Sequence, residues 1–278
     1  MPHAYLTTTT LKGTGALNID GTAYDARLRQ VIEAVSDQID RYCNRTFQPF
    51  SGTYTVDGPG GTLLDLPKDL LAIGTLLEDS NEDGTFETGW ATTDYFYFPR
   101  TADPTSDYGR PYTWLQVNPH SDGTQDEFIR GPRMYRVTGT WGFLSLITTA
   151  APSLSGSHNS TTAGILASTV GIEPGMTILI DTEPMYVLST ATTTLTVYTP
   201  RGINGVAAGT HASGTVIQYY TYPAPIREAC LVQSSRLWKR RESGYATEVG
   251  IPETGQVTIF RGLDPDVKEL LTPYRRLH

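Results

Sequence analysis

The strongest constraint in this sequence is one amphipathic stretch near its start, TAYDARLRQVIEAVSDQIDRYCNRTF at residues 22–47. Its apolar residues recur every three or four positions, which is the spacing of one face of an α-helix. They are Tyr24, Leu28, Val31, Ile32, Val35, Ile39, Tyr42 and Cys43. We therefore predict a helix over residues 23–43, about 31 Å long at 1.5 Å per residue. Asp20 or Thr22 would cap its start, and Asn44 suits a left-handed stop.

A helix of this kind needs an apolar partner, and the matching pattern lies near the other end of the chain. Residues 225–241 place apolar side chains on one helical face, and three small residues there permit close helix–helix approach: Ala229, Cys230 and Ser234. We predict that the first helix packs on this late helix. A third, shorter helix follows Asp264, a good N-cap, and ends near Pro273.

Between the two long helices the sequence favours β-structure. Short runs of alternating residues separated by Gly- and Pro-rich turns predict strands at residues 53–57, 62–66, 70–78, 112–117 and 134–143. Together with the helices, these runs predict an α+β fold in which a helical bundle carries β-strands.

The composition changes sharply in the middle of the chain. From residue 151 to residue 219 the only charged residues are Glu173, Asp181, Glu183 and Arg201, and Thr, Ser, Gly and Ala dominate. Short β-patterned runs predict that residues 149–220 form an inserted small all-β domain, either a barrel or a sandwich. The remaining parts are then an N-terminal arm (1–21), a discontinuous core domain (22–148 and 221–278) and a C-terminal segment (263–278).

Charge and targeting signals limit the function. The net charge is −8 and the pI is about 5.1, so binding of nucleic acid would require a local basic patch. No apolar run is long enough to cross a membrane, and the N-terminus does not resemble a secretory signal. We interpret Cys43 and Cys230 as buried free thiols rather than a disulfide, and we expect the protein to fold in a cytoplasm.

Catalytic motifs are not evident. The five histidines show no zinc-binding spacing, and the sequence has no phosphate-binding glycine loop and no nucleophile elbow. We therefore predict that the protein is not an enzyme and that it needs no cofactor, with one exception. Calcium-type spacing of oxygen ligands occurs at Asp79, Asn81, Asp83, Thr85 and Glu87, with Gly84 at the turn position. This loop is either a structural Ca²⁺ site or an acidic hairpin turn, because Trp90 replaces the usual bidentate glutamate.

Two further surfaces are candidates for protein contacts. The polar face of the first helix alternates in charge at Arg29, Glu33, Asp37 and Arg41, which is either a side-to-side contact between copies or ordinary solvated surface. The C-terminal segment combines an apolar stripe with an aromatic residue and two arginines, the composition of a binding hot spot. Its residues are Leu270, Leu271, Tyr274, Arg275 and Arg276. The alternative is a helix that packs back on its own domain.

An ordered series of short motifs resembles a known family. The series begins with NR-x-F (Asn44, Arg45, Phe47) and DY-x-x-x-P (Asp94, Tyr95, Pro99), continues with RPY (Arg110–Tyr112) and VTGTWG (Val137–Gly142), and ends with RLWKRRESG, LDPDV and LL-x-PYRR. Together these motifs resemble the head–tail connector proteins of tailed bacteriophages, also called adaptor or head-completion proteins. The resemblance covers roughly residues 20–147 and 222–278, and the inserted domain is outside it.

The resemblance implies a structural virion protein made in the host bacterial cytoplasm. Members form a ring, expected to be twelvefold, beneath the portal, where they extend the DNA channel and hold the next connector or tail protein. Leu270, Leu271, Tyr274, Arg275 and Arg276 would then contact the portal protein, and Arg29, Glu33, Asp37 and Arg41 would contact neighbouring copies. Genomic DNA would pass through the lumen without specific binding. The alternatives are a head-closure (stopper) or tail-completion protein, and a receptor- or carbohydrate-binding virion β-protein.

Overall fold

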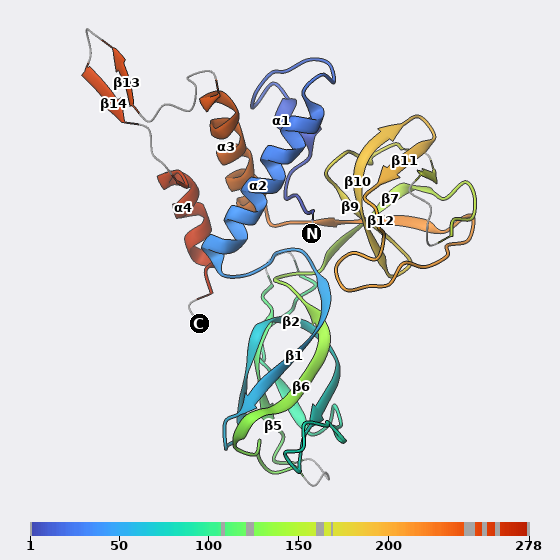
Figure 1. The fold of residues 1–278 in the computed structure, drawn as a ribbon, viewed down its shortest axis with the longest axis vertical. Coiled ribbons are helices and arrows are strands. Elements are labelled where there is room, and N and C mark those ends of the chain that lie inside the picture. The colour runs from blue at the N-terminus through green and yellow to red at the C-terminus, as the bar shows by residue number, and fades with distance from the viewer. Residues whose placement is uncertain are drawn as a thin grey trace. The chain divides into compact units, whose positions relative to one another are not determined.

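The computed structural model describes residues 2–106, 109–120, 125–159, 164–167, 169–241, 248–251, 255–258 and 262–276. The chain forms two compact units. Unit 1 consists of Met1–Asn44, Ile147–Ile203 and Ala208–His278, and unit 2 consists of Arg45–Leu146 and Asn204–Ala207. The fold is mixed α+β, with two antiparallel six-stranded sheets and four α-helices in the described residues (Figure 1).

The helical part of unit 1 is built around the predicted pair. Helix α2 (Asp25–Cys43) packs on α3 (Ala224–Arg240), and α4 (Pro265–Leu271) packs on α3 in turn (Figure 1). Ala229, Cys230 and Ser234 are fully buried, so the small residues do permit the close approach. A short helix, α1 (Thr8–Lys12), and a 3₁₀ turn, η1 (Thr272–Tyr274), complete this part.

The helix ends are partly as predicted. Asn44 is left-handed, with φ of 52°, and its N–H donates to the carbonyl of Asp40, so the predicted stop is confirmed. The predicted N-cap is wrong, because Tyr24 occupies that position without a capping side chain. Asp264 caps α4 as predicted, since its side chain accepts from the N–H of Asp266 at 2.9 Å.

Unit 2 is one sheet and its apolar core. Its strands are β1 (Phe50–Gly58), β2 (Leu63–Glu78), β3 (Thr88–Trp90), β4 (Tyr95–Phe98), β5 (Tyr112–Val117) and β6 (Gly131–Trp141). The order is β1-β6-β2-β5-β4, with β3 also paired to β2. The strands predicted at residues 62–66 and 70–78 are in fact one long strand, β2, with a register shift between Asp65 and Leu70. Trp141 is fully buried in this core.

The second six-stranded sheet lies in unit 1 and is formed by the Thr-rich part of the sequence. Its strands are β7 (Leu146–Ser153), β8 (Gly164–Leu166), β9 (Thr177–Ile180), β10 (Glu183–Ala191), β11 (Thr194–Val197) and β12 (Val216–Thr221). The order is β7-β12-β9-β10-β11-β8. The described strands form no closed barrel, because the two end strands, β7 and β8, do not pair with each other. The residues that directly follow them, Leu154 and Ala167, are linked by an isolated bridge. The barrel alternative is therefore not supported.

A separate two-stranded hairpin, β13 (Glu248–Ile251) and β14 (Gly255–Thr258), lies between α3 and α4 in the sequence. The compact units group the residues differently from the predicted core domain and insertion, so the boundaries of those domains stay a prediction.

Candidate functional site

The segment before α2 is held tightly inside unit 1. Tyr5 is buried, its N–H donates to Ser36 Oγ at 3.1 Å, and its hydroxyl donates to the carboxylate of Asp40. His3 Nε2 lies 3.3 Å from the same carboxylate. Further along, the N–H of Thr8 donates to the carbonyl of Pro174. The segment predicted as an N-terminal arm thus binds both to α2 and to the loop that precedes β9.

The C-terminal candidate residues divide into buried and exposed groups. Leu271 is fully buried in unit 1, Leu270 and Tyr274 are half-buried, and Arg275 is exposed. The backbone N–H of Arg276 donates to the carbonyl of Cys43 at 2.8 Å, and the guanidinium of Arg275 lies 5.2 Å from the ring centroid of Tyr42. Portal binding by this segment stays a prediction, and Arg275 offers the most exposed side chain for it.

The four residues predicted as a ring contact form two separate pairs. Arg29 and Glu33 lie 3.4 Å apart, and both also contact β10: Arg29 donates to the carbonyl of Leu188 at 2.8 Å, and Tyr186 donates to Glu33 at 2.9 Å. Asp37 and Arg41 lie 2.6 Å apart, and their side chains are 52% and 79% exposed. Only the second pair is therefore widely accessible to a neighbouring copy.

This division predicts different results for two charge reversals. Arg29→Glu should destabilise unit 1 by about 1–3 kcal/mol, because the carbonyl of Leu188 loses its donor and two carboxylates then face each other. Arg41→Glu should change stability by less than about 0.5 kcal/mol, since the pair is exposed. Urea unfolding gives both values, and mass photometry compares oligomer formation. If Arg41→Glu leaves the oligomer intact, the predicted ring contact at this pair is wrong.

The acidic loop between β2 and β3 is ordered by its own hydrogen bonds. Asp79 is buried, and its carboxylate accepts from the N–H groups of Asp83 at 3.1 Å and Gly84 at 2.8 Å. Gly84 has φ of 89°, so it makes the sharp turn that the spacing predicted. Hydrogen bonds from Thr85 hold the pKa of Asp83 below its usual value. Carboxylate oxygens of Asp79, Asp83 and Glu87 lie within 4.8 Å of one another, which suits the 2.3–2.6 Å ligand distances of calcium.

Asn81 and Thr85, the other two predicted ligands, also bond inside this loop. The Asn81 amide exchanges hydrogen bonds with Asp83 at 3.1 Å, and the N–H of Thr85 donates to Asp83 at 2.8 Å. The donor set fits a hard cation, while the same groups satisfy one another without one. Calcium binding therefore stays a prediction.

We expect Asp79→Ala to destabilise unit 2 by about 1–3 kcal/mol, because two backbone N–H groups lose their acceptor. Asn81→Ala is the matched control, and its exposed position should limit the loss to about 0.5 kcal/mol. Urea unfolding of both variants in chelator measures this effect alone. Equal losses would contradict the assignment of Asp79 as the residue that orders the loop. Calcium is tested on the unaltered protein: a Tm that is identical in millimolar Ca²⁺ and in chelator would remove that prediction.

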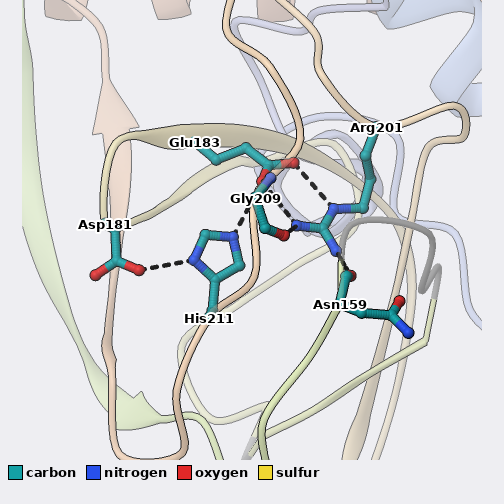
Figure 2. Close-up of polar contacts among 6 residues, drawn as sticks. All are labelled: Asn159, Asp181, Glu183, Arg201, Gly209 and His211. Carbon is teal, nitrogen blue, oxygen red and sulfur yellow. Dashed lines mark hydrogen bonds and ion pairs between the residues drawn. The ribbon is translucent and has the colours of Figure 1, made fainter.

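Within the described residues, a further polar cluster lies in the second sheet, and motif analysis of the sequence did not identify it. It joins Asp181, Glu183, Arg201 and His211, which come from the β9–β10 turn, the start of β10, the residues after β11 and the segment before β12 (Figure 2). Glu183, Arg201 and His211 are all buried. The scarcity of charge in this region was the one available signal, because three of its four charged residues meet here.

Unit 1 also contains a cavity of about 490 Å³, within the size range of ligand pockets. Its walls are the N-terminal segment around Tyr5, the loop at Glu173, the end of β12 at Tyr222, and the first turns of α3 at Arg227 and Glu228. The charges on its walls have both signs, so they favour no single class of ligand.

Comparisons with known proteins give no family assignment. No protein-family model matches the chain, and no curated protein matches it. None of the helices in the described residues is long and apolar enough to cross a membrane.

Proposed function

We propose that this protein is a structural head–tail connector of a tailed bacteriophage, which forms a ring beneath the portal and extends the DNA channel toward the tail. The observation that carries the proposal is the arrangement of the chain ends in unit 1. The resemblance rests on motifs at both ends of the sequence. The N–H of Arg276, the last residue of LL-x-PYRR, donates to the carbonyl of Cys43, which directly precedes NR-x-F. One helical core thus joins both ends, in agreement with the helical bundle that the resemblance implies.

The finer architecture belongs to the same proposal. The core is the bundle of α2, α3 and α4 with its β-strands, and residues 149–220 are a β-insertion added to it. The insertion contacts α2 through Arg29 and Tyr186. The insertion would then project from the surface of the ring, where a neighbouring ring, the capsid or a fibre can bind to the insertion.

The partners follow from this role. The portal protein would bind the C-terminal segment, the next connector or tail protein would bind the opposite end of the ring, and copies of the chain would bind one another, twelve being the number that the resemblance implies. A net charge of −8 is compatible with a conduit through which DNA passes without being held, because the 29 Asp and Glu residues outnumber the 21 Lys and Arg residues that could bind phosphates.

The alternatives have less support. A stopper or tail-completion protein would share the ring and the axial position, and it differs in the neighbour that it binds. A carbohydrate-binding role of the insertion requires exposed aromatic side chains. Tyr186 is fully buried and donates to Glu33, so it is not available to a sugar, and Tyr198 is 38% exposed. A single exposed ring of this kind gives the sugar-binding role of the insertion less support than the connector role. No described residue set matches a catalytic motif, and we propose no enzymatic activity.

The experiment that tests the proposal uses the purified full chain and the portal protein of the same virus. Electron microscopy and mass photometry of the mixture should show rings with a central channel bound coaxially to the portal. A chain that stays monomeric at all concentrations and does not bind the portal would overturn the proposal. Binding to the distal face of a portal–adaptor complex, with none to the portal alone, would support the stopper instead.

A further inference from the structure

The sheet of unit 2 presents three aromatic side chains on the face that points away from its apolar core. Tyr97 of β4 packs against the core, and Leu115 of β5 is fully buried in it. Successive side chains of a strand point to opposite faces, so Phe96 and Phe98 of β4 and Trp114 of β5 lie on the outer face. All three side chains are half-buried, so part of each ring remains accessible.

One row of this outer face crosses three strands and consists of Phe98, Trp114 and Asp65. Phe98 of β4 is directly opposite Trp114 of β5, and Trp114 is directly opposite Asp65 of β2. The rings of Phe98 and Trp114 are stacked, with centroids 5.8 Å apart and planes at 12° to each other. Asp65 is exposed, so a carboxylate is the cross-strand neighbour of a pair of parallel rings.

The second row consists of Phe96, Gln116 and Leu63, which are paired across the same three strands. The guanidinium carbon of Arg100 lies 4.2 Å from the ring centroid of Phe96, and Leu63 is 50% exposed. The two rows therefore combine rings with groups that can form hydrogen bonds. Asp65 accepts, Arg100 donates, and the amide of Gln116 does both. We call the two rows and Arg100 the outer aromatic face.

The outer aromatic face is too small to hold a protein partner by itself. An aromatic side chain has roughly 150–250 Å² of surface, so three half-buried rings together expose about 200–300 Å². A specific protein interface buries about 800 Å² on each partner, and its centre is depleted of charged residues. Here a carboxylate and a guanidinium lie directly beside the rings. The area and the polar groups therefore favour a small polar ligand over a second copy of the chain.

The chemistry of this face matches that of a pyranose sugar. A β-linked pyranose of the glucose type carries its hydroxyls around the edge of the ring, so its two flat faces consist of C–H groups. Such a face packs on an aromatic ring, while the hydroxyls exchange hydrogen bonds with carboxylate, amide and guanidinium groups. Bases of a single-stranded nucleic acid would also stack on aromatic rings. Its phosphates, however, would be repelled by Asp65, and Arg100 alone gives the face no excess of positive charge.

We propose that the outer aromatic face of β2, β5 and β4 binds an oligosaccharide of β-linked, glucose-type pyranoses. Phe98 and Trp114 stack on the sugar rings, and Asp65, Gln116 and Arg100 bind the hydroxyls. The site lies wholly in unit 2 and outside the insertion, residues 149–220. It goes beyond the proposed connector role and does not depend on it, because no ring or portal contact enters the argument.

Tryptophan fluorescence of the full chain tests the proposal directly. Of the four tryptophans, Trp90, Trp141 and Trp238 are at most 6% exposed, whereas Trp114 is half-buried, so a ligand on this face changes mainly the emission of Trp114. Titration with cellohexaose or chitohexaose should shift the emission to shorter wavelength in a saturable way, and calorimetry should give the same affinity.

Three outcomes of this titration would overturn the proposal. The first is the absence of binding by both β-linked oligosaccharides at millimolar concentration. The second is equal affinity for maltohexaose, whose α-linkages curve the sugar chain. The third is binding of single-stranded oligo(dT) without binding of either sugar, which would make the face a nucleic-acid site.

Three variants locate the site, with binding measured by calorimetry. Trp114→Ala should weaken cellohexaose binding by roughly tenfold or more, because a stacking ring is lost. Asp65→Ala removes an exposed side chain, so it should keep the Tm of the unaltered protein and weaken binding by roughly fivefold, the value of one hydrogen bond. Tyr198→Ala removes a 38% exposed ring of unit 1 and is the matched control, with unchanged binding. Unchanged binding by Trp114→Ala and Asp65→Ala, or loss of binding in Tyr198→Ala alone, would also overturn the proposal.

Discussion

Removal of residues 263–278 is expected to unfold unit 1 rather than simply detach a docking segment. Leu263, Val267 and Leu271 are all buried, and Gln233 of α3 bonds to both the carbonyl of Gly262 and the N–H of Asp264. Each buried aliphatic side chain is worth about 2–5 kcal/mol, so their joint loss is comparable with the whole stability of a domain. Circular dichroism and thermal unfolding of the truncated chain would measure this result.

A truncation therefore cannot isolate the predicted contact with the portal. The double variant Arg275→Glu, Arg276→Glu is the sharper test, since Arg275 is exposed and Arg276 bonds to α2 through its backbone. We expect a Tm close to that of the unaltered protein and much weaker binding to the portal. Leu271→Ala is the complementary variant, with a loss of about 2–5 kcal/mol in stability. Unchanged portal binding by the double variant would contradict the assigned docking residues.

Tyr5→Ala is expected to destabilise unit 1 by about 3–5 kcal/mol, the cost of emptying a buried aromatic site. The ring of Tyr5 is 1% exposed and packs edge-on against Tyr222, with centroids 4.7 Å apart. Its hydroxyl also donates to Asp40. Tyr5→Phe separates the two contributions, because it keeps the ring and should cost only about 1 kcal/mol. Urea unfolding at pH 7 measures both values, and equal losses would contradict the packing role.

The carboxyl group of Asp40, which accepts from Tyr5, makes the stability of unit 1 depend on pH. Burial raises the pKa of Asp40 above 3.8, and hydrogen bonds from His3 and Tyr5 partly oppose that rise. The carboxyl group of Asp40 therefore holds its proton more tightly in the folded state than in the unfolded state. The free energy of unfolding falls as the pH rises from about 3.8 to the raised pKa of Asp40. Tyr5→Phe removes one donor to the carboxylate, and its stability should keep falling to a higher pH. Asp40→Asn should remove this part of the pH profile.

The helical part of the fold could be predicted well from the sequence because its signals are local. The periodicity of α2 and α3, the small residues Ala229 and Cys230, and the Asp264 cap each depend on neighbours within a few positions. The N-cap of α2 was missed because Asp20 and Thr22 suit that role by residue type, while the structure begins the helix at Asp25. Residue type alone does not determine where a helix starts.

Strand pairing was much harder to predict, since it depends on residues far apart in the chain. The sequence predicted strands at residues 53–57 and 62–66 but gave no partner for either, and the structure pairs β1 with β6, where Tyr54 faces Val137. The acidic loop is the converse case. The spacing of its oxygen ligands and the turn at Gly84 are local features, so the geometry of the loop could be predicted from the sequence. Calcium binding could not, because the same oxygen groups also satisfy one another by hydrogen bonds.

The candidate surfaces show the same limit. The alternating charge on α2 placed Arg29 and Arg41 in one predicted surface, yet Arg29 bonds to Leu188 of β10, which lies 159 positions later in the chain. The His211 cluster draws its members from four segments of the second sheet, and none of the spacings matches a motif. Sequence reasoning identified the residues that bear charge, and only the folded chain identified which of them are neighbours.

The division of the chain into units also determines the order in which they can fold during synthesis. Nearly all of unit 2 is contiguous, at Arg45–Leu146, whereas α2 must wait for α3, about 180 residues further on. At 5–20 residues per second, the ribosome needs roughly 10 to 40 s to make that stretch. Throughout this time the apolar face of α2, including Leu28, Ile32 and Ile39, lacks α3, the helix on which it packs in the folded protein. The apolar face of α2 therefore stays available to chaperones until α3, which lies in the last fifth of the chain, has been made.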